Sequence, residues 1–334
     1  MRDVAALAGV GIKTVSRVVN GEPGVSDALV RRVRDATQQL NFQPDLAAGN
    51  LRRTDRRSLS IGLLLASVDN PFCAAIHRAV EDVADDQGVA VFSASIDEDI
   101  ERERALVGVF MSHHVDGLIV SPTAADQSHL YPDRVAGTPV VLIDRPAVGV
   151  QIDAVVVDNA GAAQQATTHL LEHGHRRVCF LGDLTQIATA RERRQGYLMA
   201  MAAAGIPTAQ TRTITDLHSE VAATSAILGL LTGTERPTAL FTSQNLITLG
   251  AIRALRTLGL EHEIALVGFD DFVLADLLDP AVTVIAQAPT VIGRRAAELI
   301  FARLNGDGSP PVEIVVPTRL IARGSGEIRP PAEP

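Results

Sequence analysis

The stretch DVAALAGVGIKTVSRVVNGEPGVSDALVRRV, residues 3–33, carries the pattern of three short helices. Small apolar residues share one face of the first helix, and the turn GVG at 9–11 interrupts it. Valines then repeat at helical spacing from 15 to 19, and Asn20-Gly21 ends this second helix. Ser26 can cap a third helix, whose inward face is predicted to carry Leu29, Val33, Ala36 and Leu40. Two short helices around a glycine-containing turn, braced by a third, form a helix-turn-helix unit.

The second of these helices presents a distinctive face opposite its valines. When the valines face the core, Ile12, Lys13, Ser16 and Arg17 fall on the outer side. Arginine and lysine can bond the acceptor edge of guanine, serine can bond phosphate or base, and an apolar side chain can touch a thymine methyl group. This face therefore suits the major groove of DNA, although a solvated three-helix bundle would show the same spacing.

Charge is unevenly distributed along the chain. Residues 1–57 carry ten basic and six acidic side chains, a net charge of +4. The whole chain carries −9, so the remainder carries −13. A basic head is attracted to nucleic acid and an acidic body is repelled by it, which agrees with DNA binding through the first residues alone.

Composition narrows the class of protein. The 334 residues suggest about two domains, and the plentiful aliphatic residues favour a folded α/β chain. Cys73 and Cys179 lie far apart in no metal or redox spacing, no apolar run approaches the roughly 20 residues of a membrane span, and no signal peptide is recognisable. We therefore expect a cytoplasmic protein. The sequence contains no G-x-S-x-G, G-x-G-x-x-G or Walker motif, so we expect no enzyme and no cofactor.

From Leu59 onward, apolar strand patterns alternate with helical ones. Strands are predicted at LSIGLLL (59–65), VDGLIVS (115–121), PVVLID (139–144) and IALVGFD (264–270), among others. Such alternation indicates doubly wound parallel sheets. Ligands of these folds bind beyond the carboxyl ends of the strands.

Polar side chains and one aromatic follow these strand ends or lie near them. They are Asn70, Phe72, Ser121, Asp144, Arg145, Arg193, Gln244, Asn245 and Asp270. Carboxylates, amides and a guanidinium group around an aromatic ring suit a polyhydroxylated ligand, most simply a sugar. Each also has a structural alternative: Arg193 as an exposed helix charge, Phe72 as core, and Asp270 or Asp271 as a helix cap.

HLLEHGHRRV at 169–178 invites a metal-site hypothesis. His169 and His173 are one helical turn apart and His175 follows. No third ligand is forced nearby, and Gly174 is typical of a helix C-cap before a strand, so we favour a structural role for these histidines.

The quoted N-terminal motif resembles the DNA-binding domain of the lactose/galactose repressor family of bacterial transcription regulators. The resemblance implies base readout by Ile12, Lys13 and Arg17 and phosphate contacts by Thr14, Ser16 and Asn20. It also implies that 45–57 is a hinge helix and linker. There Leu51 wedges open the central base step of the operator and Ala48 is the small residue beside it.

The body resembles the same family and, through it, the periplasmic sugar-binding proteins. DNPF, IDRP, RRQGY, VGFDD and RPTALFTS match family landmarks. The resemblance implies two subdomains joined by three crossovers, near Val157-Asp158, Gln287 and 317–320. It makes Phe72, Asp144, Arg193 and Asp270 the leading effector contacts, with Gln287 lining the cleft.

These expectations define the organisation of the chain. We expect a helix-turn-helix domain at 1–44, the hinge at 45–57, an effector-binding core at 58–323 and a disordered tail at 324–334. Within the core, subdomain 1 takes about 58–157 and 288–320, and subdomain 2 about 158–287.

Several positions depart from the family pattern. Gly11 stands where serine is usual, Asp45 replaces asparagine, Gly49 replaces arginine, and Gln244-Asn245 replaces an Asn-Asp pair. Glycine inside a helix costs about 1 kcal/mol relative to alanine, so we expect a hinge that folds less readily than most. The family usually has a few more residues before the position of Met1, which implies either an upstream start or weaker DNA binding.

The predicted function is a ligand-responsive regulator of transcription, most simply a repressor. We expect a homodimer on a pseudo-palindromic operator, because one helix-turn-helix buries little DNA surface and the C-terminal residues carry no heptad pattern for a tetramer. The expected partners are double-stranded DNA, a small effector such as a sugar, and a second copy of the chain. The alternative is a solute receptor of the periplasmic sugar-binding type without a role on DNA.

Overall fold

The computed structural model describes residues 1–19, 22–42, 57–131 and 135–331. The chain divides into two compact units, Met1–Ser60 and Ile61–Pro334.

The first unit is a three-helix cluster. Its helices are α1 (Arg2–Ala8), α2 (Ile12–Val19) and α3 (Asp27–Gln39). Gly9 ends α1 in the left-handed conformation at φ 61°, which a residue without a Cβ adopts at little cost. The small core contains Val4, Ala8 and Val15, with Val33 from α3.

Two sequence expectations for this unit need correction. Leu40, expected in the core, is 43% exposed, because α3 ends one residue earlier and Leu40 is its C-cap. Ser26 precedes α3 as expected, but its side chain makes no capping hydrogen bond.

The second unit contains two six-stranded sheets, which define two subdomains. The first sheet has the order β11-β5-β4-β3-β1-β2. Its strands are β1 (Ser60–Leu65), β2 (Ala90–Ser95), β3 (Gly117–Val120), β4 (Val140–Ile143), β5 (Asp153–Val156) and β11 (Glu313–Val315). Its helices are α5 (Pro71–Asp86), α6 (Ile100–Ser112) and α11 (Pro289–Leu304), with a 3-10 turn, η1 (Ser128–Leu130).

The second sheet has the order β12-β10-β9-β8-β6-β7. Its strands are β6 (Val178–Leu181), β7 (Arg212–Ile214), β8 (Ala239–Thr242), β9 (Ala265–Phe269), β10 (Thr283–Ala286) and β12 (Arg319–Ile321). Its helices are α7 (Asn159–Glu172), α8 (Ala188–Ala203), α9 (Glu220–Leu231) and α10 (Asn245–Leu258), with η2 (Thr208–Gln210) and η3 (Ser325–Glu327). Neighbouring strands of this sheet run parallel, except that β12 runs antiparallel to β10.

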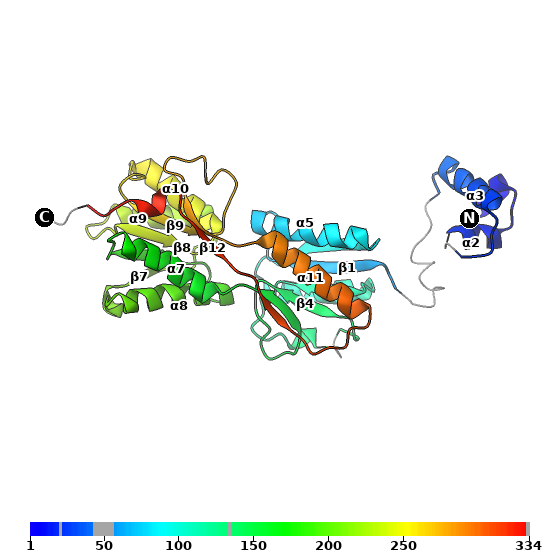
Figure 1. Ribbon diagram of the computed structural model, residues 1–334, viewed down its shortest axis with the longest axis horizontal. Helices are drawn as coiled ribbons and strands as arrows, with labels where there is room; N and C mark the ends of the chain where they lie inside the picture. Colours follow the sequence, from blue (N-terminus) through cyan, green and yellow to red (C-terminus); the bar gives the residue numbers. More distant parts are fainter. Residues whose placement is uncertain (20–21, 43–56, 132–134, 332–334) are drawn as a thin grey trace. The chain divides into compact units, whose positions relative to one another are not determined.

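Helices cover both faces of each sheet, so the central strands are apolar on both sides. In β1, Leu63 packs with α5 and α11, whereas its neighbour Leu64 packs with α6 on the opposite face. Figure 1 shows α11 lying beside α5. The contact is close because Gly293 of α11 approaches the α5 backbone, where a Cβ would come within 2.5 Å of the Ile76 carbonyl oxygen.

Three connections join the subdomains. β5 of the first sheet leads into α7 on the second, β10 of the second leads into α11 on the first, and β11 of the first leads into β12 of the second. These passages fall at 157–158, 287–288 and 316–318. Residues 319–321 therefore pair with the second sheet, whereas the boundary expected from sequence placed 319 and 320 with the first.

Residues 324–331 are ordered, which corrects the expectation of disorder for this part of the tail. Ser325 is buried, donates from Oγ to the Leu266 carbonyl at 2.6 Å and accepts from the Thr283 amide at 2.9 Å. Glu327 accepts from Thr283 Oγ1 at 2.8 Å and bonds His169 Nε2. Glycine and proline content suggested disorder, but contacts distant in sequence hold this segment against the second sheet.

Candidate functional site

A cavity lies between the two subdomains, at the carboxyl ends of their strands. Its volume is about 360 Å³, within the range of roughly 300–1,000 Å³ typical of small-molecule pockets. Nine of the ten residues expected at an effector site line it: Asn70, Phe72, Ser121, Asp144, Arg145, Arg193, Gln244, Asp270 and Gln287.

Two aspartates occupy equivalent places in the two subdomains. Asp144 follows β4 with φ 66°, and Asp270 follows β9 with φ 71°. The left-handed region is open to few residues other than glycine, and aspartate is among them because its short side chain can bond locally. Both side chains reach the cavity, one from each wall.

Arg193 interacts electrostatically with both carboxylates and is held in place by the second subdomain. Its Nε donates to Asn159 Oδ1 at 2.8 Å and its Nη1 to the Ser243 carbonyl at 2.7 Å. The guanidinium carbon lies 3.8 Å from the centroid of the Phe269 ring. The residue is 6% exposed, so the alternative of an exposed helix charge is wrong.

The electrostatics of the cleft follow from this burial. Burial raises the pKa of the Asp144 carboxyl, and Asp270 raises it further against the lowering effect of Arg145 and Arg193. Burial likewise raises the pKa of Asp270, while Arg193 and a hydrogen bond from Gln287 lower it. Gln287 Nε2 donates to Asp270 Oδ1 at 2.6 Å. The two carboxylates thus lack part of the solvation that ligand hydroxyl groups can supply.

Arg145 is engaged by the protein itself. It forms a two-point ion pair with Glu98, at 2.8 Å from Nη1 and 2.5 Å from Nη2, and Nη1 also bonds the Pro122 carbonyl at 2.9 Å. Its Nε lies 3.6 Å from Asp144. Arg145 therefore positions the loop around Asp144 while it lines the cavity.

Asn245 is the expected contact that does not line the cavity. It begins α10, and its Nδ2 donates to Oδ1 of Asn70 at 2.9 Å. Gln244, just before it, caps α10 at Leu246 and donates to Asp183 at 3.1 Å.

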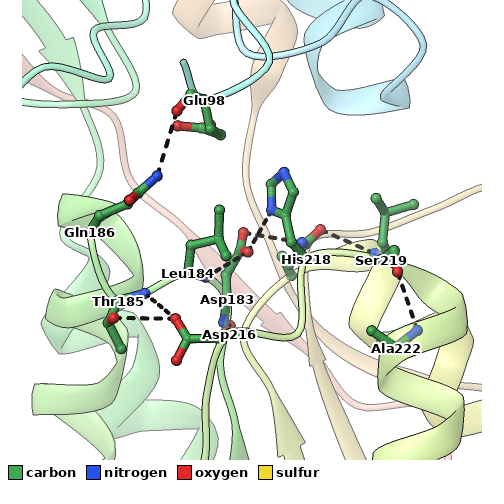
Figure 2. Close-up of polar contacts among 12 residues, drawn as sticks. Glu98, Asp183, Leu184, Thr185, Gln186, Asp216, His218, Ser219 and Ala222 are labelled. Atoms are coloured by element: carbon green, nitrogen blue, oxygen red, sulfur yellow. Dashed lines mark hydrogen bonds and ion pairs between the residues drawn. The ribbon is translucent and has the colours of Figure 1, made fainter. Parts of the chain in front are cut away.

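Five ionisable cavity residues were missed by sequence reasoning: Asp69, Asp97, Glu98, Asp183 and His218. His218 Nδ1 bonds Asp183 Oδ1 at 2.7 Å, and this bond raises the pKa of the imidazole against desolvation. Figure 2 shows Glu98 on the opposite wall, where its carbonyl accepts from Gln186 Nε2 at 3.5 Å. The strand-end rule that found Asp144 would also have found Asp183, which follows CFLG.

Other candidate groups have structural roles. Asp271 pairs with Arg323, with both oxygens at 2.7 Å, and caps no helix among the described residues. His175 bonds Thr238 Oγ1 and the Ile328 carbonyl, and His173 bonds the His169 carbonyl. No group of three potential metal-binding side chains occurs within the described ranges. Burial raises the pKa of Cys73 to about 11 and that of Cys179 to about 12, so both thiols stay protonated.

The face of α2 opposite the core carries the expected DNA-reading residues. Val15 is buried, whereas Ile12, Lys13 and Arg17 are exposed. Thr14 and Ser16 are half-buried at its flanks. Asn20, Ala48 and Leu51 lie outside the described residues, as does most of the expected hinge.

A helix-turn-helix unit and a two-subdomain ligand cleft in one chain define a ligand-controlled DNA-binding protein. Comparisons with known proteins agree. The model for bacterial regulatory proteins of the lacI family matches residues 1–45, and that for a periplasmic binding protein-like domain matches 167–326. The chain is 35% identical to the HTH-type transcriptional regulator CelR of Thermobifida fusca, over 97% of each protein. It is 30% identical to the ribose operon repressor of Escherichia coli, over 97% of this chain and 99% of that protein.

The chain belongs to the LacI family of bacterial transcription regulators. It is a DNA-binding regulator and not an enzyme. Its fold is similar to that of the Lac repressor bound to operator and the anti-inducer ONPF, with a TM-score of 0.84 at 24% identity over 97% of this chain and 98% of that one. A CelR–cellobiose complex matches with a TM-score of 0.69 at 32% identity, over 97% and 98%. Within the described ranges, no helix has the length and apolar character to cross a bilayer.

Proposed function

We propose that this regulator is a repressor whose operator binding is controlled by a sugar, or a closely related polyhydroxylated molecule, in the cleft. The observation that carries the proposal is the convergence of Asp144, Asp270 and Arg193 from opposite walls. Ligand hydroxyl groups can donate to the two carboxylates and accept from the guanidinium. Such groups satisfy buried polar atoms that cost free energy when left unpaired.

The relatives support the same ligand class. One is named a ribose operon repressor and another was solved as a complex with cellobiose. The cleft of this chain offers an aromatic side chain, Phe72, beside its polar groups. Sugars present an apolar ring face together with hydroxyl groups, so this combination fits them.

Control of DNA binding requires that the ligand discriminate between two arrangements of the protein. A ligand that bonds both walls favours the arrangement in which the walls are close. The three connections between subdomains would act as the hinge of that motion. We propose that residues 45–57, with Ala48 and Leu51 at the central base step, transmit the change to the operator.

We further propose a cytoplasmic homodimer that reads a pseudo-palindrome with its two α2 helices. Large apolar side chains exposed on the second unit support a dimer. Phe92 on edge strand β2 is 51% exposed, and Val273, Leu274 and Leu277 in the loop after β9 are 80%, 58% and 74% exposed. Exposed apolar residues grouped in one loop are typical of interaction surfaces.

Selection of bound sequences from random double-stranded DNA tests the DNA-reading part of this proposal. The full-length protein should enrich a pseudo-palindrome. A Lys13→Ala, Arg17→Ala double variant should enrich no sequence. Enrichment of the same sequence by both proteins would overturn the assignment of α2 as the reading helix.

A further inference from the structure

The cleft carries a marked excess of negative charge. Two guanidinium groups, Arg145 and Arg193, and one imidazole, His218, face six carboxylates. The carboxylates belong to Asp69, Asp97, Glu98, Asp144, Asp183 and Asp270. Even with His218 protonated, the lining side chains sum to a negative charge.

Both arginines of the cleft already donate hydrogen bonds to protein groups. Arg145 gives both terminal nitrogens to Glu98. Arg193 gives Nε to Asn159 and Nη1 to the Ser243 carbonyl, so its Nη2 is the nitrogen without a partner among the described residues. Arginine recognises a carboxylate or phosphate best with two parallel N–H groups, and each of these side chains already gives part of its donors to the protein.

His218, the third basic group of the cleft, also interacts with carboxylates. His218 is bonded to Asp183, and Glu98 on the opposite wall adds to the effect of Asp183 in raising the imidazole pKa. Figure 2 shows the His218 ring, on the loop before α9, directed toward the wall that carries Glu98. Asp97 adds a further carboxylate to this side of the cavity, next to Glu98. We call Asp97, Glu98 and Asp183 the acidic rim.

Carboxylates also line the deep part of the cleft. Asp270 is buried and Asp144 is partly buried, and both carboxylates line the cavity together with Arg193. Interactions between charges strengthen as the effective dielectric constant falls, so a ligand anion placed here would be repelled more strongly than at the surface. A hydroxyl group can donate to these carboxylates, and an ammonium group can do so with a favourable charge.

We propose that the cleft accepts uncharged and amino-bearing polyols and rejects carboxylated and phosphorylated ones. The rule concerns the charge of the effector and rests on the proposed function, that the cleft is the effector site. It assigns a specificity role to the acidic rim, which lies beside the Asp144, Asp270 and Arg193 group.

Isothermal titration of the full-length protein with matched sugars tests the rule. The probes are glucose, glucosamine, gluconate and glucose 6-phosphate, with the corresponding galactose and ribose series and cellobiose. Within any series that binds, the anionic members should bind at least about tenfold more weakly than the neutral parent, which corresponds to about 1.4 kcal/mol. The amino member should bind at least as tightly as the parent.

Two variants connect the rule to the acidic rim. Asp97→Asn combined with Asp183→Asn removes two negative charges. This double variant should reduce the difference in affinity between the neutral and the anionic members of a sugar series. Asp86→Asn is the control, because it removes one carboxylate at the far end of α5, roughly 24 Å along the helix from Asn70. The control variant should leave the difference in affinity between neutral and anionic sugars unchanged.

The two proposals fail differently. An anionic sugar that binds as tightly as its neutral parent overturns the charge rule and leaves a sugar effector in place. An unchanged difference in the rim variant overturns the role of the acidic rim. If no member of any series binds, the sugar effector itself is contradicted, and the charge rule falls with it.

Discussion

The side chains of Asn70 and Asn245 exchange hydrogen bonds across the cleft. Asn245 Nδ2 donates to Asn70 Oδ1 at 2.9 Å, and Asn70 Nδ2 donates to Asn245 Oδ1 at 3.4 Å. Asn70 caps α5 in the first subdomain and Asn245 begins α10 in the second. This pair therefore links the N-termini of two helices on opposite walls.

The amide pair should couple the stabilities of the two subdomains. Asn70→Ala and Asn245→Ala should show an interaction energy of about 0.5–1.5 kcal/mol in a double-mutant cycle measured by urea unfolding. Asn70→Ala alone should cost about 1 kcal/mol more, because its Oδ1 also caps the Phe72 amide at 3.0 Å. Asn305→Ala, at the exposed end of α11, is the control partner for Asn70→Ala. Simple additivity for the Asn70 and Asn245 changes would contradict the link.

Base readout should depend on exposed side chains of α2. Lys13→Ala and Arg17→Ala should each weaken operator binding by about 1–3 kcal/mol, as expected for a lost base contact. The melting temperature should change little, because both residues are exposed and Arg17 makes only a surface ion pair with Glu22 at 3.5 Å. Arg295→Ala removes an equally exposed charge from α11, in the effector-binding domain, and should leave operator affinity intact. Full affinity in both α2 variants would refute this assignment.

The burial of Asp144 predicts a specific dependence of stability on pH. Its folded pKa is raised above the ordinary 3.8, so the folded state holds the proton more tightly than the unfolded state does. Its contribution to stability is therefore favourable at low pH and is lost as the pH rises from about that value through the folded pKa. Asp144→Asn should raise the melting temperature of the ligand-free protein at neutral pH, and the gain should shrink in acid.

The exposed Asp126 has a lowered pKa, opposite to the shift of Asp144. A hydrogen bond from the Ser128 amide lowers the pKa of Asp126, so its contribution is present above 3.8 and lost as the pH falls. Asp126→Asn should not stabilise the protein at neutral pH. A stability gain from Asp144→Asn that persisted undiminished in acid would contradict the burial argument.

Dimerisation should depend on the apolar loop after β9. Leu277→Asp places a charge where a 74% exposed leucine is proposed to meet a second copy. Light scattering should report a dimer for the original protein and a shift toward monomer for the variant. Ala209→Asp, at the exposed η2 turn, is the control. A monomer, or a tetramer, for the unaltered chain would disprove the proposed assembly.

Much of the architecture could be predicted from the alternation of strand and helix patterns. Several buried strands are followed directly by a polar residue, and parallel strands bring their carboxyl ends to one edge, which is why Asp144 and Asp270 could be named in advance. Glu98 and His218 could not, because both lie in turns after edge strands, β2 and β7, at positions that no pattern marks. The partner of Arg145 was missed for the same reason.

The C-terminal segment shows a second limit of sequence reasoning. Glycine and proline dominate 324–334, and local composition predicted disorder. Ser325 instead bonds Leu266 and Thr283, more than 40 residues earlier in the chain. Such contacts depend on the folded arrangement of the second sheet, so no local sequence pattern predicts them.

The most direct test of the account measures operator affinity with and without effector. Fluorescence anisotropy of the selected operator, titrated with full-length protein, should show an affinity that changes when the binding sugar is added. Asp270→Asn should bind the operator with ordinary affinity and lose the response, because its carboxylate is proposed to accept a ligand hydroxyl in a cleft where an unmatched polar group is costly. Operator affinity that ignores every sugar, or an Asp270→Asn variant that responds in full, would contradict control through this cleft.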